Sequence, residues 1–483
     1  MNPLLYTDGY KVDHRRQYPD KTTLVYSNWT PRMSRIKDVD QVVFFGLQYF
    51  IKKYMIADFN INFFNQPKSE VCKKYQRRIN NYLGENNVGI KHIEDLHDLG
   101  YLPMLIKALP EGVSVPIRVP MLTMYNTKAE FFWLTNYFET ILSTTLWLPC
   151  NSATIAKQYR KILDQYAQQT SSVPEFVDWQ GHDFSMRGMG GLEAAIVSSA
   201  GHLLSFTGTD TIPTIDFLED YYNANSDTDL IGGSVAATEH SVMCMGTNTG
   251  EQETFKRLIS EVYPNGIVSI VSDTWDLWKV LTEYLPNLKN EVLARNGKVV
   301  IRPDSGDPAD IICGNPNGKT EAAKKGVIQL LWEIFGGTTN AKGYKELDSH
   351  IGAIYGDSIT IERATNICER LKQNGFASTN VVLGIGSFTY QYNTRDTFGF
   401  AMKATYGEVD GEAREIYKNP ITDDGTKKSA KGLIKIEKQN GNYKLVDQVS
   451  WEEEQKGELK EVFKDGKLLI DDSLTEIRKR IRT

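Results

Sequence analysis

The sequence predicts an α/β fold: an irregular parallel α/β barrel with a second, β-rich (α+β) domain. From about residue 176, short apolar runs recur, and each ends in a polar or glycine cluster that often precedes a helical stretch. The seven clusters favour a barrel, in which the loops after the strands converge on one face; a doubly wound open sheet is the alternative. After residue 395, short alternating runs separated by glycine turns indicate the β-rich part.

The elements before the barrel are mostly helical. Apolar positions at helical spacing predict helices at 41–55 and 69–82. The run 129–147 is apolar and aromatic, which indicates a buried helix that ends before Pro149. An amphipathic helix follows at 153–170.

Short apolar runs mark the strands of the barrel. We expect these strands at 176–179, 204–206, 232–236, 266–271, 298–301, 351–355 and 381–383. Helices are expected at 275–284, 320–335 and 360–373. Later strands are expected at 397–406, 414–418, 432–437 and 442–446, and a last helix at 473–482. The predicted domains are a catalytic barrel over 176–394, with 1–25 and 125–150 packed on it, and a second domain from 26–124 and 395–483.

Composition excludes several classes of protein. The net charge of −6 over 483 residues argues against a general nucleic-acid binder. No apolar run approaches the ~18 residues of a membrane span, and the N-terminus lacks the pattern of a signal peptide. Five widely spaced cysteines fit a reducing cytoplasm. The histidines show no metal-binding spacing, so we expect no metal ligands from the protein.

The densest chemical cluster follows the predicted strand 298–301. Arg302 offers a planar donor fork that suits phosphate. Asp304 and Asp307 can accept hydrogen bonds from sugar hydroxyls or bind Mg²⁺. The alternative is a strand-end ion pair with a tight turn, since Asp-Ser-Gly is good turn chemistry.

Glycine clusters after two further strands can approach a phosphate closely. They are Gly356-Asp357 and Gly384-Ile385-Gly386-Ser387, and each alone is equally consistent with a simple turn. Neither a full G-x-G-x-x-G nor a P-loop is present. Taken alone, four scattered basic residues are interpreted as charged side chains exposed to solvent: Arg395, Lys403, Lys418 and Lys427. By themselves, His182, His202 and His240 read as structural histidines, and Tyr10 and Phe184 as core residues.

Together these motifs resemble one family, the nicotinamide phosphoribosyltransferases, nearly from end to end. The motifs that carry the resemblance are 7–12 (TDGYKV), His182-Asp183-Phe184 with Arg187-Gly188, Gly208-Thr209-Asp210, Glu239-His240, Val271-Ser272-Asp273, 301–306 (IRPDSG), Gly356-Asp357 and Thr394-Arg395-Asp396. The resemblance implies the type II phosphoribosyltransferase fold and a homodimer with shared active sites. It also implies a pentosyl transfer from phosphoribosyl pyrophosphate to nicotinamide in NAD salvage.

The resemblance assigns roles residue by residue. Phe184 matches the aromatic ring that stacks on nicotinamide, and Tyr10 the ring that the second subunit supplies. Asp210 matches the carboxylate that accepts from the amide. The remaining substrate-binding residues are Arg187 and Arg302 for pyrophosphate, Asp304 for ribose, Gly356 and Asp357 for the nucleotide, and Gly386, Ser387, Arg395 and Lys403 for phosphate. Arg395 and Lys403 are expected to act across the dimer interface.

The resemblance further implies coupling to ATP. His240 matches a histidine that ATP phosphorylates, and Glu239 is the expected partner of its ring. Asp304 and Arg302 complete the expected catalytic group. Mg²⁺ is expected on the pyrophosphate, with ATP as a co-substrate or activator.

Three features depart from the family pattern. Gly188-Met189-Gly190-Gly191 replaces a polar run, Ser387 replaces a frequent glycine, and Ala401 stands where a phosphate-binding serine is common. Loss of a hydrogen bond to a charged group costs about 1.5–3 kcal/mol, so these changes bear on phosphate affinity.

Two alternatives stand beside this interpretation. Nicotinate phosphoribosyltransferase shares the fold, but the Asp210 carboxylate would repel a nicotinate carboxylate. A binding or scaffold protein would not need Arg302, Asp304, Asp357 and Arg395 together.

Overall fold

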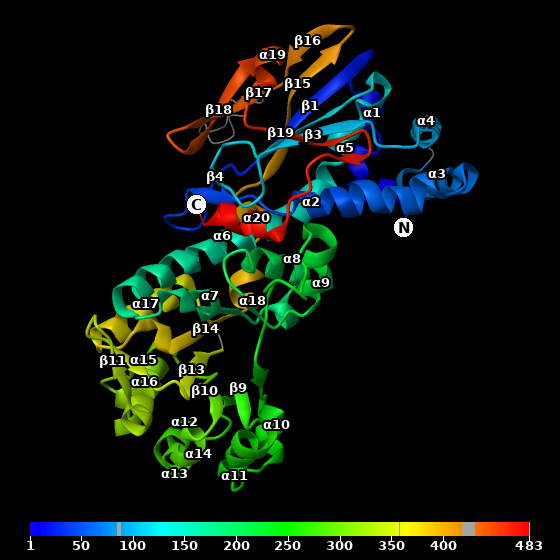
Figure 1. Ribbon diagram of the computed structural model, residues 1–483. Coiled ribbons are helices and arrows are strands. Elements are labelled where there is room, and N and C mark those ends of the chain that lie inside the picture. Colours follow the sequence, from blue (N-terminus) through cyan, green and yellow to red (C-terminus); the bar gives the residue numbers. More distant parts are fainter. Residues whose placement is uncertain (85–87, 357, 418–429, 483) are drawn as a thin grey trace. The chain divides into compact units, whose positions relative to one another are not determined.

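The structure is a computed structural model that describes residues 1–84, 88–356, 358–417 and 430–482 (Figure 1). The chain forms two compact units. Unit 1 comprises Met1–Thr154, Phe217–Ala224 and Asn393–Thr483, and unit 2 comprises Ile155–Asp216 and Asn225–Tyr392. The segments 1–25 and 125–150 belong to unit 1. No described helix is both long enough and apolar enough to cross a membrane.

Within its described residues, unit 2 has a sheet of seven parallel strands. Their order is β7-β6-β14-β13-β10-β9-β8. The strands are β6 (Gly181–Asp183), β7 (Gly208–Thr209), β8 (Ala236–Ala237), β9 (Asn265–Val271), β10 (Asn296–Arg302), β13 (Ile351–Tyr355) and β14 (Val381–Ile385). In β9, β10, β13 and β14 the buried positions are mostly branched aliphatic residues, as in other parallel sheets covered on both faces.

The two edges of this sheet meet. Gly208 of β7 forms a parallel bridge with Gly233, three residues before β8. Thr209 N donates to Gly233 O at 3.0 Å, and Gly233 N donates to Thr207 O at 2.8 Å. The segment 233–237 therefore links β7 to β9, which makes the sheet the irregular barrel that the sequence predicts. The carboxyl ends of the strands consequently share one rim.

Helices connect these strands. The α-helices that lie within unit 2 are α7 (Val177–Gln180), α8 (Leu192–His202), α10 (His240–Met245), α11 (Glu251–Arg257), α12 (Leu277–Lys279), α13 (Leu285–Asn287), α14 (Lys289–Leu293), α15 (Pro308–Cys313), α16 (Glu321–Phe335), α17 (Ile361–Gln373) and α18 (Ser387–Tyr390). A strand pair, β11 (Gly337–Thr339) with β12 (Lys345–Leu347), lies outside the barrel.

Besides 232–236, of which only Ala236 lies in the observed strand β8, two predicted barrel strands were misplaced. Residues 176–179 fall mainly in α7, because Pro174 starts a helical turn just before it. Residues 204–206 close the end of α8, where Phe206 N donates to His202 O. In both cases the strand begins a few residues later, at the glycine that precedes the polar cluster.

Unit 1 is built on an antiparallel sheet with the strand order β16-β15-β1-β5-β3-β19-β20. The strands of unit 1 are β1 (Thr22–Thr30), β2 (Gln41–Val43), β3 (Met104–Ala108), β4 (Ser114–Pro116), β5 (Leu122–Asn126), β15 (Ala401–Val409), β16 (Glu412–Glu415), β17 (Leu433–Gln439), β18 (Asn442–Val449), β19 (Lys460–Lys464) and β20 (Lys467–Leu468). Its helices include α1 (His14–Gln17), α2 (Leu47–Phe50), α3 (Lys68–Leu83), α4 (Lys91–Leu99), α5 (Leu134–Tyr137), α19 (Trp451–Glu454) and α20 (Leu474–Ile481). The unit boundary passes through α6 (Glu139–Thr170) and α9 (Pro213–Tyr222).

Two helix predictions for this part of the chain were wrong. The two expected helices on either side of Pro149 form the single 32-residue helix α6. Proline removes one backbone hydrogen bond, and the burial of Leu146 and Cys150 beside it offsets this loss. The predicted helix 41–55 begins instead as strand β2. Gly46, with φ +107°, turns the chain into α2 and the π-helical turn Ile51–Asp58.

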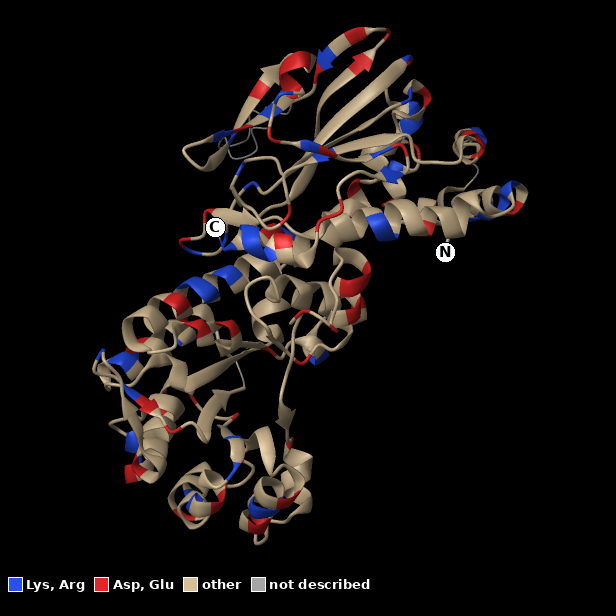
Figure 2. Cartoon of the chain, viewed as in Figure 1, with Lys and Arg blue, Asp and Glu red and all other residues tan. Residues whose placement is uncertain are grey.

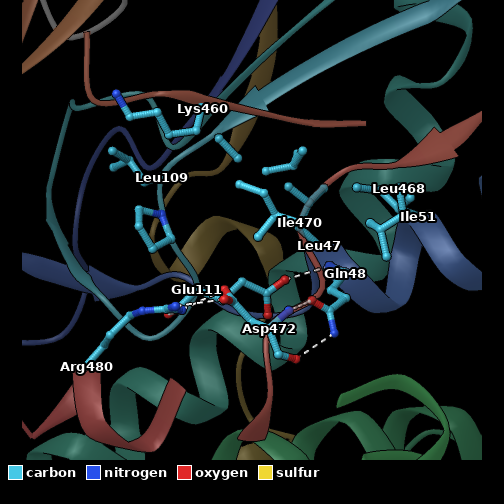
Figure 3. A pocket seen from close by; sticks show the side chains of 13 residues that line it. Leu47, Gln48, Ile51, Leu109, Glu111, Lys460, Leu468, Ile470, Asp472 and Arg480 are labelled. Atoms are coloured by element: carbon cyan, nitrogen blue, oxygen red, sulfur yellow. Dashed lines mark hydrogen bonds and ion pairs between the residues drawn. The ribbon is translucent and has the colours of Figure 1, made fainter. Parts of the chain in front are cut away.

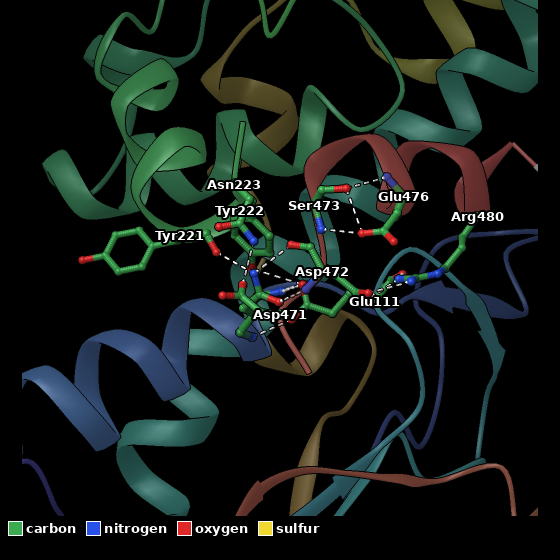
Figure 4. A network of polar contacts seen from close by, with 11 residues as sticks. Glu111, Tyr221, Tyr222, Asn223, Asp471, Asp472, Ser473, Glu476 and Arg480 are labelled. Atoms are coloured by element: carbon green, nitrogen blue, oxygen red, sulfur yellow. Dashed lines mark hydrogen bonds and ion pairs between the residues drawn. The ribbon is translucent and has the colours of Figure 1, made fainter. Parts of the chain in front are cut away.

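A buried carboxylate organises one polar network of unit 1 (Figure 4). Glu111 accepts hydrogen bonds from Gly46 N at 3.0 Å, Gln48 N at 2.6 Å and Tyr222 OH at 3.1 Å. Arg480 of α20 donates to Glu111 O at 3.0 Å and pairs with Asp472 at 2.7 Å. The network thus ties the start of α2 to segments far along the chain. It borders a cavity of about 120 Å³, whose upper wall is largely apolar (Figure 3).

Candidate active site

The carboxyl ends of β6 and β7 bring the predicted residues Phe184 and Asp210 together with His182, which was interpreted as structural. His182 lies on β6 and Phe184 directly follows this strand, with their ring centroids 4.6 Å apart. His182 Nε2 lies 2.9 Å from Asp210 Oδ1, and Ser234 Oγ donates to the same oxygen at 2.6 Å. Asp210 is 46% exposed, and among the described residues its Oδ2 has no hydrogen-bond partner. This oxygen is therefore available to a donor on a ligand beside the Phe184 ring.

The charge of Asp210 is set by its neighbours. Partial burial alone would raise its pKa, but hydrogen bonds from His182 and Ser234 and the nearby Arg302 lower the pKa below its ordinary value. The carboxyl group is consequently ionised at neutral pH. An anion at this position favours an amide N–H₂ and disfavours a carboxylate ligand.

A buried layer beneath these groups fixes the loops. The Asp183 carboxylate accepts from Ser185, Thr209 and Thr211 at 2.6–3.0 Å. His202 lies within 2.7 Å of Tyr390 OH, and burial lowers its pKa to about 4, so its ring is neutral. His202 therefore acts as the structural histidine that we expected.

The ends of β9 and β10 bring a second group together. Arg302 Nη2 donates to the backbone oxygen of Thr238 at 2.6 Å, and Thr238 directly precedes Glu239 and His240 in the chain. Asp273 Oδ2 accepts from Asp304 N at 2.9 Å and from Ser305 Oγ at 2.5 Å. Burial lowers the pKa of Arg302 below its ordinary value, against the opposing effect of Asp304, Asp210 and Asp273. The guanidinium remains charged.

His240 stands between carboxylates. Its Nε2 lies 4.0 Å from both Asp273 Oδ1 and Asp304 Oδ2, and its Nδ1 lies 3.1 Å from Thr274 Oγ1. The ring is 49% exposed, whereas the Asp273 side chain is 5% exposed and its Oδ1 has no hydrogen-bond partner among the described residues. The imidazole is therefore accessible from solvent.

Glu239 does not take the role that we predicted for it. Its carboxylate accepts from Ser241, and within the described structure the contacts of the His240 ring come from Thr274, Asp273 and Asp304. The reason is geometric: Glu239 precedes α10 with an extended backbone, while His240 begins that helix. Thr274, which follows β9, is the residue placed to orient the ring.

Two glycines let the strand ends approach one another. A Cβ atom on Gly356 would lie 2.7 Å from Asp304 Oδ1, and one on Gly384 would lie 2.6 Å from the Phe184 ring. Both positions therefore need glycine to keep Asp304 and Phe184 where they are. Asp357, Lys418 and Lys427 lie outside the described residues.

The remaining predicted residues of unit 2 surround the start of α18. Arg187 is exposed and makes no hydrogen bond or ion pair within the described structure. Ser387 begins α18 and packs on Gly188, and Gly386 precedes it with open space where a Cβ atom would lie. Gln391 Oε1 accepts from Gly190 N at 2.7 Å. The two unusual stretches of sequence, 188–191 and 387, thus touch each other.

The other three predicted residues belong to unit 1. Tyr10 is 64% exposed, and its ring lies 5.2 Å from the His14 ring and 5.1 Å from Lys11 Nζ. Arg395 is 51% exposed and pairs with Asp396 at 3.2 Å. Both side chains are accessible to a ligand or a second subunit.

Lys403 lines a small cavity of about 60 Å³, named here the basic pocket. Arg32 and Arg118 also line it, and none of its described lining residues is acidic. Basic and acidic residues are interspersed along both units (Figure 2), so this concentration of positive charge is local.

Sequence reasoning missed several residues of these sites. Asp273 and Thr274 belong to a strand-end cluster, Ser272-Asp273-Thr274, and that position was the available signal. Ser234, Arg32 and Arg118 carried no comparable signal. Among the described residues there is no group of three or more histidine, cysteine or acidic side chains that could hold a metal ion.

Family models agree with a phosphoribosyltransferase fold. Residues 179–467 match the nicotinate phosphoribosyltransferase (NAPRTase) family, and residues 2–106 match the nicotinamide phosphoribosyltransferase N-terminal domain. A solved nicotinate-nucleotide pyrophosphorylase from Pyrococcus furiosus has the same fold, with a TM-score of 0.59 at 14% identity, over 100% of this chain and 95% of that one.

Sequence relatives narrow the family. A nicotinamide phosphoribosyltransferase from Acinetobacter baylyi is 55% identical over 100% of this chain and 97% of its own length. One from Mycoplasma pneumoniae is 37% identical over 89% of this chain and 95% of its own length. The chain belongs to the nicotinamide phosphoribosyltransferase family.

Proposed function

We propose that this protein joins nicotinamide to phosphoribosyl pyrophosphate, giving nicotinamide mononucleotide and pyrophosphate. The observation that carries the proposal is the exposed Asp210 carboxylate beside the Phe184 ring. One of its oxygens is held by His182 and Ser234, and the other is available to the amide N–H₂ of nicotinamide. The ring nitrogen would then attack the anomeric carbon as its bond to pyrophosphate breaks.

The charges of unit 2 suit the other substrate. Arg187 and Arg302 would neutralise the departing pyrophosphate, with Mg²⁺ bound chiefly by the pyrophosphate itself. Asp304 and Asp357 would hold the ribose hydroxyls, beside the backbone of Gly356. Gly386 and Ser387 would bind the 5′-phosphate at the start of α18. This arrangement stabilises charge that develops as the glycosidic bond breaks.

His240 would couple ATP to this reaction. The exposed ring can take the γ-phosphoryl group of ATP, with ADP as the leaving group. A phosphate on this ring would meet the carboxylates of Asp273 and Asp304, each 4.0 Å away. Arg302 and Mg²⁺ would have to balance that charge. Phosphorylation would therefore favour a site loaded with Mg²⁺ and phosphoribosyl pyrophosphate.

A homodimer in the cytoplasm would complete each site. Tyr10, Arg395 and Lys403 are accessible in unit 1 and would be supplied by the second subunit to the nicotinamide ring and the phosphates. A shared site makes the dimer a requirement for activity.

A product assay tests the function. The purified chain is incubated with nicotinamide, phosphoribosyl pyrophosphate and Mg²⁺, with and without ATP, and nicotinamide mononucleotide is measured by chromatography. Formation of this product, increased by ATP, is expected. Absence of product under both conditions would refute the proposal.

Nicotinate phosphoribosyltransferase is the second candidate. The match of residues 179–467 to the nicotinate phosphoribosyltransferase family favours it. The ionised Asp210 disfavours it, since two carboxylates would face each other at the ring substituent.

A further inference from the structure

The basic pocket of unit 1 is built on two paired strands. Across β1 and β15, Asn28 lies opposite Lys403 and Thr30 lies opposite Ala401. Side chains two residues apart on a strand share a face, so Lys403, Ala401 and Thr405 point the same way. All of them line the pocket together with Arg32 and Arg118.

The wall of the pocket contains unsatisfied polar groups. Asn28 Nδ2 and Thr405 Oγ1 are buried and have no hydrogen-bond partner among the described residues. The two residues are 4% and 0% exposed. Buried polar groups are normally paired, so orphaned ones beside a cavity point to a missing ligand or water. Among the described residues that line the pocket, three are basic and none is acidic, which indicates that this ligand is an anion.

Arg118 has an unusual backbone conformation for its residue type. Val119 N donates to Pro116 O at 3.1 Å, which closes a four-residue turn with Arg118 as its third residue. Arg118 has φ +74°, a value that such turns usually give to glycine. Its own N–H donates to Pro31 O at 2.6 Å, next to Arg32. The turn therefore fixes Arg118 against the segment that carries the second arginine of the pocket.

No side-chain contact among the described residues explains why Arg118 occupies this strained position. It is exposed, and within the described residues its guanidinium makes no hydrogen bond or ion pair. A strained residue without a structural partner suggests a functional role. Ala401 contributes no hydroxyl to the pocket, whereas a guanidinium offers several donors in a fork that fits phosphate.

We infer that Arg118 is a phosphate-binding residue, held in its strained turn so that its guanidinium completes the basic pocket with Arg32 and Lys403. The ligand class is a phosphate monoester or pyrophosphate. Its identification with the phosphates of phosphoribosyl pyrophosphate rests on the proposed function, but the binding of an inorganic anion does not.

The test uses Arg118→Gly in the full chain. Glycine relieves the turn, so the Tm should stay the same or rise by about 2 °C. The same change should weaken the binding of inorganic pyrophosphate, measured by calorimetric titration, by about tenfold, as expected for a lost charge-assisted hydrogen bond. Arg118→Lys should recover part of the affinity, because it restores the charge without the fork.

Lys21→Gly is the matched control. Lys21 also has a positive φ, +63°, and pairs with Asp410 at 2.8 Å on the surface, outside the pocket. Its replacement removes one positive charge and one strained residue, and pyrophosphate affinity should change by less than twofold. Equal losses of pyrophosphate affinity in the two glycine variants would show that the effect comes from net charge alone, and would overturn the inference.

Steady-state kinetics distinguish a failure of this inference from a failure of the proposed function. If the proposed function holds, Arg118→Gly should raise the KM for phosphoribosyl pyrophosphate about tenfold and change kcat by less than twofold. Unchanged pyrophosphate affinity together with unchanged KM would show that Arg118 does not bind phosphate. A chain that makes no nicotinamide mononucleotide would refute the function alone, since the pyrophosphate titration needs no turnover.

Discussion

Gly188 and Ser387 fit against each other with no room for another atom. A Cβ atom on Gly188 would lie 2.0 Å from Ser387 Oγ and 2.5 Å from Ser387 Cβ. The hydroxyl can rotate away, but the Cβ of Ser387 cannot without moving the backbone of α18. The residues at 188 and 387 are therefore physically coupled, since a serine at 387 requires a glycine at 188.

The first prediction follows from this pair. Gly188→Ala should lower the free energy of unfolding by about 1–3 kcal/mol, because the added methyl overpacks against Ser387. Adding Ser387→Gly should recover most of the loss. Chemical unfolding of both single variants and the double variant measures the coupling. Gly386→Ala is the control, because no atom lies within 4 Å of its added Cβ. Additive effects at 188 and 387 would contradict the coupling.

The second prediction concerns ring specificity. Asp210→Asn should lower kcat/KM for nicotinamide and raise it for nicotinate, shifting their ratio by about tenfold or more. The asparagine can keep the contact with Ser234 while it removes the negative charge and offers an N–H₂ donor. Steady-state kinetics with both substrates gives the ratio. Ser234→Ala is a useful comparison, since it removes one hydrogen bond to Asp210 but keeps the charge. An unchanged ratio of kcat/KM for the two substrates in Asp210→Asn would show that Asp210 does not select between them.

The third prediction concerns ATP. His240→Ala should abolish ATP stimulation and ATPase activity, yet leave slow synthesis without ATP, because Phe184, Asp210 and Arg302 remain. Product formation with and without ATP is compared in the variant, and acid-labile phosphate is measured in the parent protein. Thr274→Ala should reduce stimulation only in part, since Thr274 contacts the ring but carries no phosphate. Full ATP stimulation in His240→Ala would exclude the coupling role.

The fourth prediction concerns stability and pH. Burial raises the pKa of Glu111 from 4.5 to about 7, against the hydrogen bonds from Gln48, Gly46 and Tyr222. The folded chain therefore binds this proton more tightly than the unfolded chain. The resulting stabilisation is full below about pH 4.5 and is lost as pH rises to about 7. It amounts to at most about 3 kcal/mol.

Glu111→Gln tests this pH dependence. The variant should flatten the fall in unfolding free energy between pH 5 and pH 8, measured by denaturant titration at several pH values. Glu476→Gln is a suitable control, because this carboxyl lies in the same part of unit 1, and hydrogen bonds from Ser473 lower its pKa instead. An unchanged slope in Glu111→Gln would assign the pH dependence to other groups.

The sequence predicted the parts of the fold that depend on local patterns. Strand 351–355 was predicted with its observed bounds, because an apolar run there ends directly in a glycine cluster. The helix across Pro149 was missed, since the burial that stabilises it comes from tertiary packing. The same holds for the site. Strand-end motifs pointed to Arg302, Asp304 and Asp210, whereas the basic pocket depends on Asn28 pairing with Lys403, which no local pattern reveals.

The fifth prediction concerns the shared site. Tyr10→Ala and Arg302→Ala should each be inactive alone. Mixed under conditions of subunit exchange, they should regain up to about a quarter of the parent activity. In a heterodimer, one site carries both changes and the other carries neither. Recovery is measured as nicotinamide mononucleotide formation, with exchange verified by tagged subunits. No recovery despite exchange would mean that each subunit holds a complete site.

A competition assay tests the central claim most directly. The parent protein is given equimolar nicotinamide and nicotinate with limiting phosphoribosyl pyrophosphate, Mg²⁺ and ATP, and both mononucleotide products are quantified by mass spectrometry. Because the ionised Asp210 accepts from an amide and repels a carboxylate, nicotinamide mononucleotide should exceed nicotinate mononucleotide by at least about tenfold. An excess of nicotinate mononucleotide would contradict the assignment.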